Sequence, residues 1–328
     1  MRFRKVAALA ALSALAGAVG ALPAGASQLV DRNATDVRIE VDGQGRALLL
    51  YNADGRARHV LAVGKGVNAL APTKGAKQVS LTLDYGGGWG LYHQTTWKTF
   101  VNACRPYTGP QLAWFVTGCT APDGSYWALQ SFPQPLPDLG FTPWTPAQRE
   151  TWLELSHWTG PLPQLQVFQD WVYDGKYDEI FGRYTYLDTP VYGFGTTNVG
   201  APTDGFGRLI YLDTFDATAY GSGWRRENSF VSHNPSGIFC YGFFGFDPTK
   251  GGYVHPPNDT TFRQPGVGTQ YRLTAEGPGL LPDVTWQGPA LGPFDKTNPQ
   301  DTAVQSQMVS QLQQLAAGDT SCNGGHVQ

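Results

Sequence analysis

Residues 167–181, VFQDWVYDGKYDEIF, carry the clearest structural signal in this sequence. Asp174-Gly175 is typical of a two-residue β-hairpin turn, whose two central residues both need positive φ. β-Branched and aromatic residues flank this dipeptide, as they do in antiparallel strands. The stretch therefore predicts a hairpin. Counting outward from the turn pairs Tyr173 with Lys176, Val172 with Tyr177, Trp171 with Asp178 and Asp170 with Glu179.

The composition extends this prediction to the whole chain. Many turn formers (41 Gly, 24 Pro) accompany many aromatic residues (10 Trp, 15 Tyr, 17 Phe), and only 15% of the residues are charged. Such a chain favours short strands over long helices. We predict an all-β fold, an antiparallel, jelly-roll-like β-sandwich, with a propeller-like arrangement or two β domains as alternatives. Short apolar or alternating runs place early strands at 37–41, 47–51, 58–63 and 78–84.

The first 26 residues are typical of a secretory signal peptide. A basic start, MRFRK, precedes an apolar, alanine-rich run, and residues 24–26, AGA, fit a small-x-small cleavage site before Ser27. Cleavage removes three of the 23 Lys+Arg and none of the 26 Asp+Glu, which leaves a net charge of −6. No later segment approaches the roughly 18 apolar residues of a membrane-spanning helix. We expect a secreted, extracellular chain whose acidic surface argues against nucleic acid as a partner.

After the signal peptide, the sequence predicts one β-rich domain over residues 27–318. The proline-rich stretch 132–146 is the best linker candidate, so a subdivision near 132–148 is the alternative. Residues 301–318 predict an amphipathic helix with Asp301 as N-cap and Gly318 at its end. Residues 319–328 form a tail tethered by Cys322. The apolar face of the helix comprises Val304, Met308, Leu312 and Leu315.

Four cysteines in an exported chain predict two disulfides. We prefer Cys104–Cys119, which closes a short loop, and Cys240–Cys322, which ties down the C-terminal tail. Residues 229–244, SFVSHNPSGIFCYGFF, predict a second hairpin, with His233 opposite Ile238 and Val231 opposite Cys240. That register would make His233 and Cys240 diagonal neighbours, so a catalytic Cys/His pair is the alternative to a disulfide. His157 is interpreted as a packed histidine.

An internal repeat lies between the two hairpins. Residues 181–189, FGRYTYLDT, and 206–214, FGRLIYLDT, agree at all but two positions. The repeat predicts a duplicated strand-and-turn unit. Asp188 and Asp213 are expected in its turns, where aspartate hydrogen-bonds the backbone.

Asp170 and Glu179 are the candidate catalytic residues. Two carboxylates directly opposite each other repel, unless a shared proton, a nearby arginine or a cation offsets the repulsion. A shared proton raises a pKa, as an acid/base pair of a glycosidase requires. The alternatives are two side chains that splay into water, or a site for a structural cation such as Ca²⁺. No zinc-ligand spacing occurs, so no metal or other cofactor is predicted.

A second cluster favours ligand binding. An aromatic face can stack on a ligand, and an arginine can grip a carboxylate bidentately. The candidate ligand-binding residues are Trp171, Tyr173, Trp224, Arg225, Arg226 and Glu227. We therefore predict an exported protein that binds a glycan or cell-envelope polymer. A secreted glycoside hydrolase or lyase is the first alternative, and a structural or interaction module without a small ligand is the second.

Overall fold

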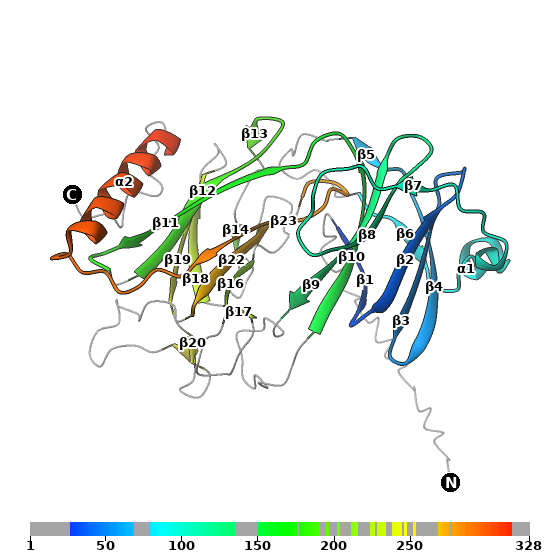
Figure 1. Ribbon diagram of the computed structural model, residues 1–328, viewed down its shortest axis with the longest axis horizontal. Helices are drawn as coiled ribbons and strands as arrows, with labels where there is room; N and C mark the ends of the chain where they lie inside the picture. The colour runs from blue at the N-terminus through cyan, green and yellow to red at the C-terminus, as the bar shows by residue number, and fades with distance from the viewer. Residues whose placement is uncertain are drawn as a thin grey trace, which may run out of the picture.

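The computed structural model describes residues 27–68, 79–134, 150–175, 177–190, 211–215, 224–226, 228–233, 238–244, 268–275 and 277–316, with short pairs at 195–196, 202–203, 246–247 and 252–253. Antiparallel sheets dominate these residues, as Figure 1 shows, which confirms the predicted all-β, sandwich-like class. The early strands fall where the sequence places them, except that only the end of 78–84 is a strand.

The central sheet lies in the middle of the molecule (Figure 1). Its strand order is β1 (Gln28–Arg32), β10 (Glu150–Thr159), β9 (Tyr126–Gln134), β8 (Phe115–Thr120), β7 (Arg105–Pro106), and the short β5 (Val67–Asn68) pairs with β10 in parallel.

Both faces of the central sheet are buried. Trp127 and Leu153 pack on one side, in a core shared with the N-terminal sheet described next. Ala128 and Trp158 pack on the other side, in a core shared with the sheets that follow in the chain. Neighbouring residues of a strand point to opposite faces, so this layer contributes alternate side chains to two cores.

The N-terminal sheet forms the layer beyond the first of these cores. Its order is β2 (Thr35–Val41), β3 (Ala47–Ala53), β4 (Arg56–Val63), β6 (Thr82–Asp84). Ile39, Leu49 and Val60 lie opposite one another in register and point into the core. The short helix α1 (Trp89–Tyr92) and the 3₁₀ turn η1 (Thr96–Lys98) follow β6.

The hairpin sheet and the β22 sheet lie on the other side of the central sheet. The hairpin sheet runs β11 (Gln164–Val172), β12 (Tyr177–Tyr186), β19 (Ile238–Phe244), β18 (Asn228–His233), with β13 (Thr189–Pro190) beside β12. The β22 sheet runs β17 (Trp224–Arg226), β16 (Tyr211–Phe215), β22 (Gln270–Ala275), β23 (Val284–Pro289). Two short pairs complete the described strands: β14 (Gly195–Thr196) with β15 (Pro202–Thr203), and β20 (Phe246–Asp247) with β21 (Gly252–Tyr253).

The first hairpin has the predicted register. Asp174 and Gly175 both have positive φ, as the two-residue turn requires. Val172 pairs with Tyr177, and the pairing continues without a shift along both strands. The second hairpin differs by one residue: His233 pairs with Phe239 rather than Ile238. Its turn residues 234–237 lie outside the described part of the chain.

Helix α2 (Pro299–Ala316) packs on the outer face of the hairpin sheet, at the end of the molecule opposite α1 (Figure 1). The sequence predicted the helix but placed its start wrongly. Asn298 caps it, because the Gln300 N–H donates to Asn298 Oδ1 at 3.0 Å and Pro299 takes the first helical position. Leu312 is fully buried, whereas the predicted face residue Val304 is exposed.

The Cys104–Cys119 disulfide is confirmed. Cys240 is also disulfide-bonded, but its predicted partner Cys322, the tail and most of the 132–148 stretch lie outside the described residues.

The two copies of the repeat do not play equivalent roles. Asp188 lies in a turn with positive φ, as expected. Asp213 lies instead within β16, opposite Arg272, so the turn prediction is wrong for this copy. Asp213 Oδ2 accepts a hydrogen bond from Arg272 Nη2 at 2.6 Å, and both side chains are buried. The same four letters, YLDT, therefore end one strand and continue another.

Candidate functional site

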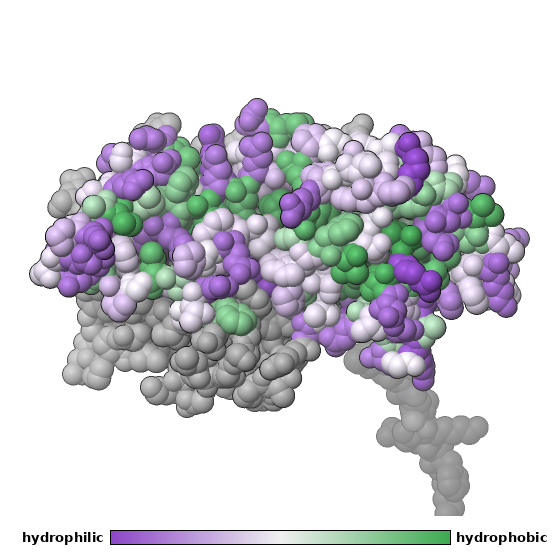
Figure 2. All heavy atoms as spheres, viewed as in Figure 1, coloured by the Kyte–Doolittle hydropathy of each residue, from purple (hydrophilic) through white to green (hydrophobic). Residues whose placement is uncertain are grey.

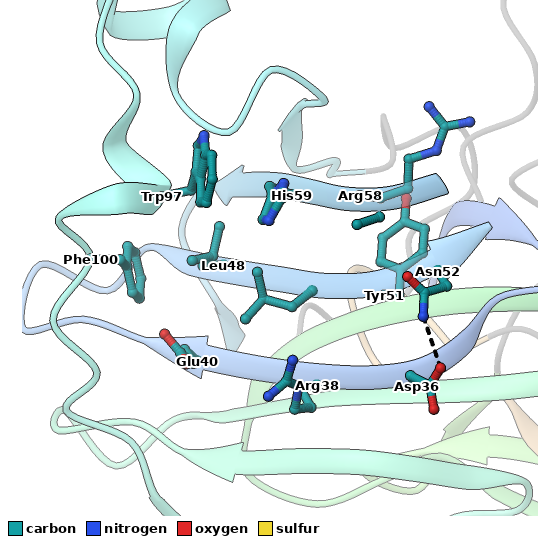
Figure 3. Close-up of a pocket in the computed structure, with 12 residues that line it drawn as sticks. Asp36, Arg38, Glu40, Leu48, Tyr51, Asn52, Arg58, His59, Trp97 and Phe100 are labelled. Carbon is teal, nitrogen blue, oxygen red and sulfur yellow. Dashed lines mark hydrogen bonds between the residues drawn. The ribbon is translucent and has the colours of Figure 1, made fainter. Parts of the chain in front are cut away.

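A groove on the outer face of the N-terminal sheet is a candidate binding site. It has a volume of about 400 Å³. Register places Arg38, Leu50 and His59 side by side across β2, β3 and β4. The next row brings Glu40 beside Leu48. Leu48 and Leu50 thus form an aliphatic floor, and Figure 3 shows Arg38 and Glu40 along the edge strand β2.

An aromatic wall closes one end of the groove (Figure 3). The Trp97 indole stacks on the His59 imidazole with ring centroids 3.9 Å apart, and Phe100 follows in the same segment. The backbone N–H of Trp97 donates to the Gly87 carbonyl at 3.0 Å, and the backbone N–H of Ala103 donates to the Val41 carbonyl at 2.7 Å. The segment is therefore fastened on both sides of the sheet that it crosses.

The triple glycine at 86–88 explains how this wall approaches so closely. Gly87 and Gly88 both have positive φ, a conformation that other residues adopt rarely. A Cβ on Gly88 would lie within 2.5 Å of the Thr96 side chain, and one on Gly87 would collide with Trp97. The glycines form a packing turn against η1.

Polar groups line the other end of the groove. Asn52 Nδ2 donates to Asp36 Oδ2 at 2.8 Å (Figure 3). The groove therefore offers arginine and amide donors, carboxylate acceptors, an aliphatic floor and aromatic rings. A site of this size and mixed lining suits a small ligand or a segment of a polymer.

The predicted carboxyl pair is formed as the hairpin register requires. Asp170 lies directly opposite Glu179, and their side chains are 0% and 5% exposed. Burial, followed by the charge of Glu179 and a hydrogen bond with it, raises the pKa of Asp170 far above its ordinary value. One proton therefore stays with the pair at neutral pH, which is the first of the three predicted offsets.

Helix α2 covers the face that carries this pair. Phe168 and Phe181, each two residues from one member of the pair, pack in a core with Leu312. The Gln305 side-chain amide accepts from the backbone N–H of Trp171 and donates to the Trp171 carbonyl. These two bonds fix the helix on β11. A polysaccharide cannot reach carboxyls buried beneath this helix.

A third buried carboxyl lies on the opposite face of the same sheet. Asp178 Oδ2 accepts a hydrogen bond from the Tyr271 hydroxyl at 2.7 Å. Burial raises the pKa of Asp178 to about 7, and the Tyr271 hydrogen bond opposes the rise. This acid was missed as a titrating group because strand alternation alone does not show that β22 lies beneath it.

Among the predicted ligand-binding residues, the structure describes the side chains of Trp171 and Tyr173. Trp171 is buried; its Nε1–H donates to the Gly292 carbonyl and its ring packs on Phe294. Tyr173 is 40% exposed at the hairpin turn. Trp224, Arg225 and Arg226 form β17, but their side chains lie outside the described part of the structure, as does all of Glu227.

The exposed Asp123 and the buried Ser125 and His157 form a hydrogen-bonded series that resembles a catalytic triad only in composition. The Ser125 hydroxyl donates to Asp123 Oδ1 at 2.6 Å, so it accepts from His157 Nε2 at 3.0 Å. A protonated Nε2 cannot take the serine proton. His157 stacks on Trp127, and burial lowers its pKa to about 4. His157 is therefore a packed, neutral histidine, as predicted.

Within the described ranges, no group of three or more His, Cys, Asp or Glu side chains is arranged to hold a metal ion. No helix in that part of the chain is long and apolar enough to cross a bilayer. In Figure 2, hydrophobic and hydrophilic residues alternate over the face toward the viewer. Comparison with protein-family models, with curated proteins and with solved structures gave no match.

Proposed function

We propose that this protein is an exported binding protein that holds a glycan or a segment of cell-envelope polymer in the groove over β2, β3 and β4. The groove itself is the observation that carries the proposal. It lies at a different place from the residues singled out in the sequence, but it has the chemistry that they were expected to supply.

The lining of the groove matches the two kinds of surface on a sugar ring. The ring carbons present an apolar face, for which Leu48 and Leu50 form a floor and Trp97 an aromatic border. The hydroxyls both donate and accept hydrogen bonds. Arg38 supplies donors and Glu40 supplies acceptors along one edge, so a hydroxyl-rich ligand finds partners of both kinds.

Further aromatic side chains continue from the wall of the groove. Gly87, whose carbonyl binds the Trp97 N–H, is two residues from Trp89. Trp89 and Tyr92 are both exposed. A polymer longer than the groove would find additional stacking surfaces here.

The glycosidase alternative uses Asp170 and Glu179. The raised proton affinity of Asp170 fits a general acid, but the burial of both carboxyls beneath α2 keeps a polymeric substrate away. Binding in the groove needs no rearrangement of the fold. We therefore prefer binding to catalysis, and an interaction module without a small ligand is the remaining alternative.

The test is depletion of the purified protein by insoluble polysaccharides and cell-wall sacculi. We expect a polymer to remove the protein from solution without release of soluble sugar. Arg38→Ala, which removes a donor from the groove, should weaken depletion at least threefold. Arg56→Ala is the matched control, because Arg56 is an exposed arginine of the same sheet outside the groove.

Three outcomes would overturn the proposal. Equal weakening by Arg38→Ala and Arg56→Ala would indicate general charge attraction instead of a groove site. Sugar release that disappears in Asp170→Asn would establish the enzyme. An absence of both depletion and release would leave a protein partner as the ligand.

A further inference from the structure

Ser27 is the residue that follows the predicted cleavage site. Ser27 is 3% exposed and its hydroxyl donates to Glu154 Oε2. Gln28, the next residue, exchanges two hydrogen bonds with the Leu81 backbone, at 3.0 and 2.7 Å. Gln28 also pairs with Leu155 in the central sheet. Ser27 and Gln28 are thus both fixed to distant parts of the fold.

Glu154 is a carboxyl in the middle of the molecule. It lies within β10, opposite Leu29 of β1 and Gln130 of β9, and is only 9% exposed. A buried carboxylate is costly unless hydrogen bonds or an opposite charge stabilise it. A hydrogen bond from a cation is roughly twice as strong as one from a neutral hydroxyl.

Covalent geometry places the Ser27 backbone nitrogen close to this carboxyl. Three bonds separate that nitrogen from Oγ, and Oγ is hydrogen-bonded to Glu154, so the nitrogen lies within about 6 Å of Oε2. In the uncut chain this nitrogen is a neutral amide. If the chain starts at Ser27, the same nitrogen is an amine that is mostly protonated at neutral pH, since an α-amine has a pKa of about 7.7 to 8.

We propose that the Ala26–Ser27 bond is a processing site and that the α-ammonium group released on Ser27 binds Glu154 as a buried ion pair. Water adds across the amide: Ala26 leaves with the new carboxylate, and Ser27 keeps the amine, which takes up a proton. The cut precedes folding, because Ser27 is enclosed in the finished fold. One extra residue moves the charge by about 3.3 Å along the strand direction, so the pair depends on the position of the cut.

The first experiment expresses the full chain in a host that exports it and determines its N-terminus by intact mass and N-terminal sequencing. We expect the secreted protein to begin at Ser27. Acetic anhydride at pH 7 then measures the accessibility of the amine. We expect the Ser27 amine to react at least tenfold more slowly in the folded protein than in urea.

The second experiment is a double-mutant cycle of folding stability. One change is Glu154→Gln, which keeps an acceptor for the Ser27 hydroxyl but removes the charge. The other is a chain that begins one residue earlier, at Ala26. We expect Glu154→Gln to lower the folding equilibrium constant at least tenfold in the chain that begins at Ser27. In the longer chain, the factor by which it lowers this constant should be at least three times smaller.

Each measurement can overturn the proposal. A different N-terminus would remove the processing site. An amine that reacts equally fast in the folded and unfolded states would remove the buried ion pair. An equal effect of Glu154→Gln in both chains would show that Glu154 does not sense the position of the charge. If Glu154→Gln does not fold, the amine reactivity of the unsubstituted protein decides.

Discussion

The N-terminal sheet and the hairpin sheet each pack one face toward the interior, and their outer faces are covered in different ways. The crossing segment at 97–103 covers one end of the N-terminal sheet and leaves a groove. Helix α2 covers the hairpin sheet and buries the carboxyl pair beneath it. Partial cover leaves an open groove, whereas full cover leaves a buried carboxyl pair that retains a proton.

The two sides of the molecule differ in the sign of their response to pH. The sandwich of the N-terminal and central sheets buries His157, which is neutral, and burial lowers its pKa. The hairpin sheet buries Asp170 and Asp178, and burial raises both pKa values. A fall in pH therefore destabilises the first region and a rise in pH destabilises the second, and the two effects oppose each other in the weakly acidic range.

The largest expected effect is that of Asp178→Asn. The folded state holds the Asp178 proton up to a pKa of about 7, against 3.8 in the unfolded chain, so its stabilising effect is lost as the pH rises through 7. Asparagine keeps an oxygen for the Tyr271 hydroxyl and never ionises. At pH 8 the variant should be more stable by about 4 kcal/mol, and at pH 3 by almost nothing. Urea unfolding at both pH values measures this; a gain independent of pH would contradict it.

His157→Gln should remove a pH-dependent change in unfolding free energy of about 3 kcal/mol, opposite in sign to that of Asp178. The depressed pKa of His157 makes the unfolded chain bind more protons between about pH 4 and 6.5, so stability falls as the pH falls through this range. A glutamine amide can still donate to Ser125. The difference in unfolding free energy between wild type and variant should shrink from pH 7 to pH 4. An NMR titration in which the His157 ring protonates near pH 6.5 would refute the buried, neutral state.

Leu312→Ala tests the covered face. Leu312 is the fully buried leucine of α2, so its truncation should cost about 3 kcal/mol of unfolding free energy. Val304→Ala, on the exposed side of the same helix, should cost less than about 0.5 kcal/mol. Denaturant unfolding compares the two variants. Equal costs would mean that α2 does not dock through this face.

Arg38→Ala should have the smallest effect on stability, below about 0.5 kcal/mol, because Arg38 is exposed. Thermal unfolding beside Arg56→Ala measures this. A clear loss of stability in Arg38→Ala alone would mean that the charged side chains along β2 stabilise the outer face of the N-terminal sheet. The contrast between the partial cover of this sheet by the 97–103 segment and the full cover of the hairpin sheet by α2 would then be weaker.

The sequence predicted what depends on neighbouring residues and missed what depends on distant ones. The register of 167–181 could be counted because Asp174-Gly175 fixes its turn. In the second hairpin, a turn of four residues is compatible with more than one strand register, and the predicted register was wrong by one residue. The helix was visible from its period, but its cap was placed three residues late because Asn298 precedes a proline.

The candidate site shows the same limit. The proximity of Asp170 and Glu179 followed from a local turn, but their burial follows from α2, which is more than a hundred residues away in the sequence. The groove brings β2, β3 and β4 together with the segment at 97–100. Its one local signal is the alternation of 36–40 and 48–52, in which an arginine and a glutamate face the same side as two leucines.

The central sheet bears on how the chain can be divided. Trp127 and Leu129 belong to one core and Ala128 to the other, and Leu280 returns from the C-terminal part of the chain to pack with the first core. A fragment that ends near residue 160 would expose one whole face of this sheet to water, and the complementary fragment would lack the layer on which it rests. We expect the separated fragments to associate when they are expressed together, which gel filtration would detect. The cores on the two faces of the central sheet should therefore fold and unfold together.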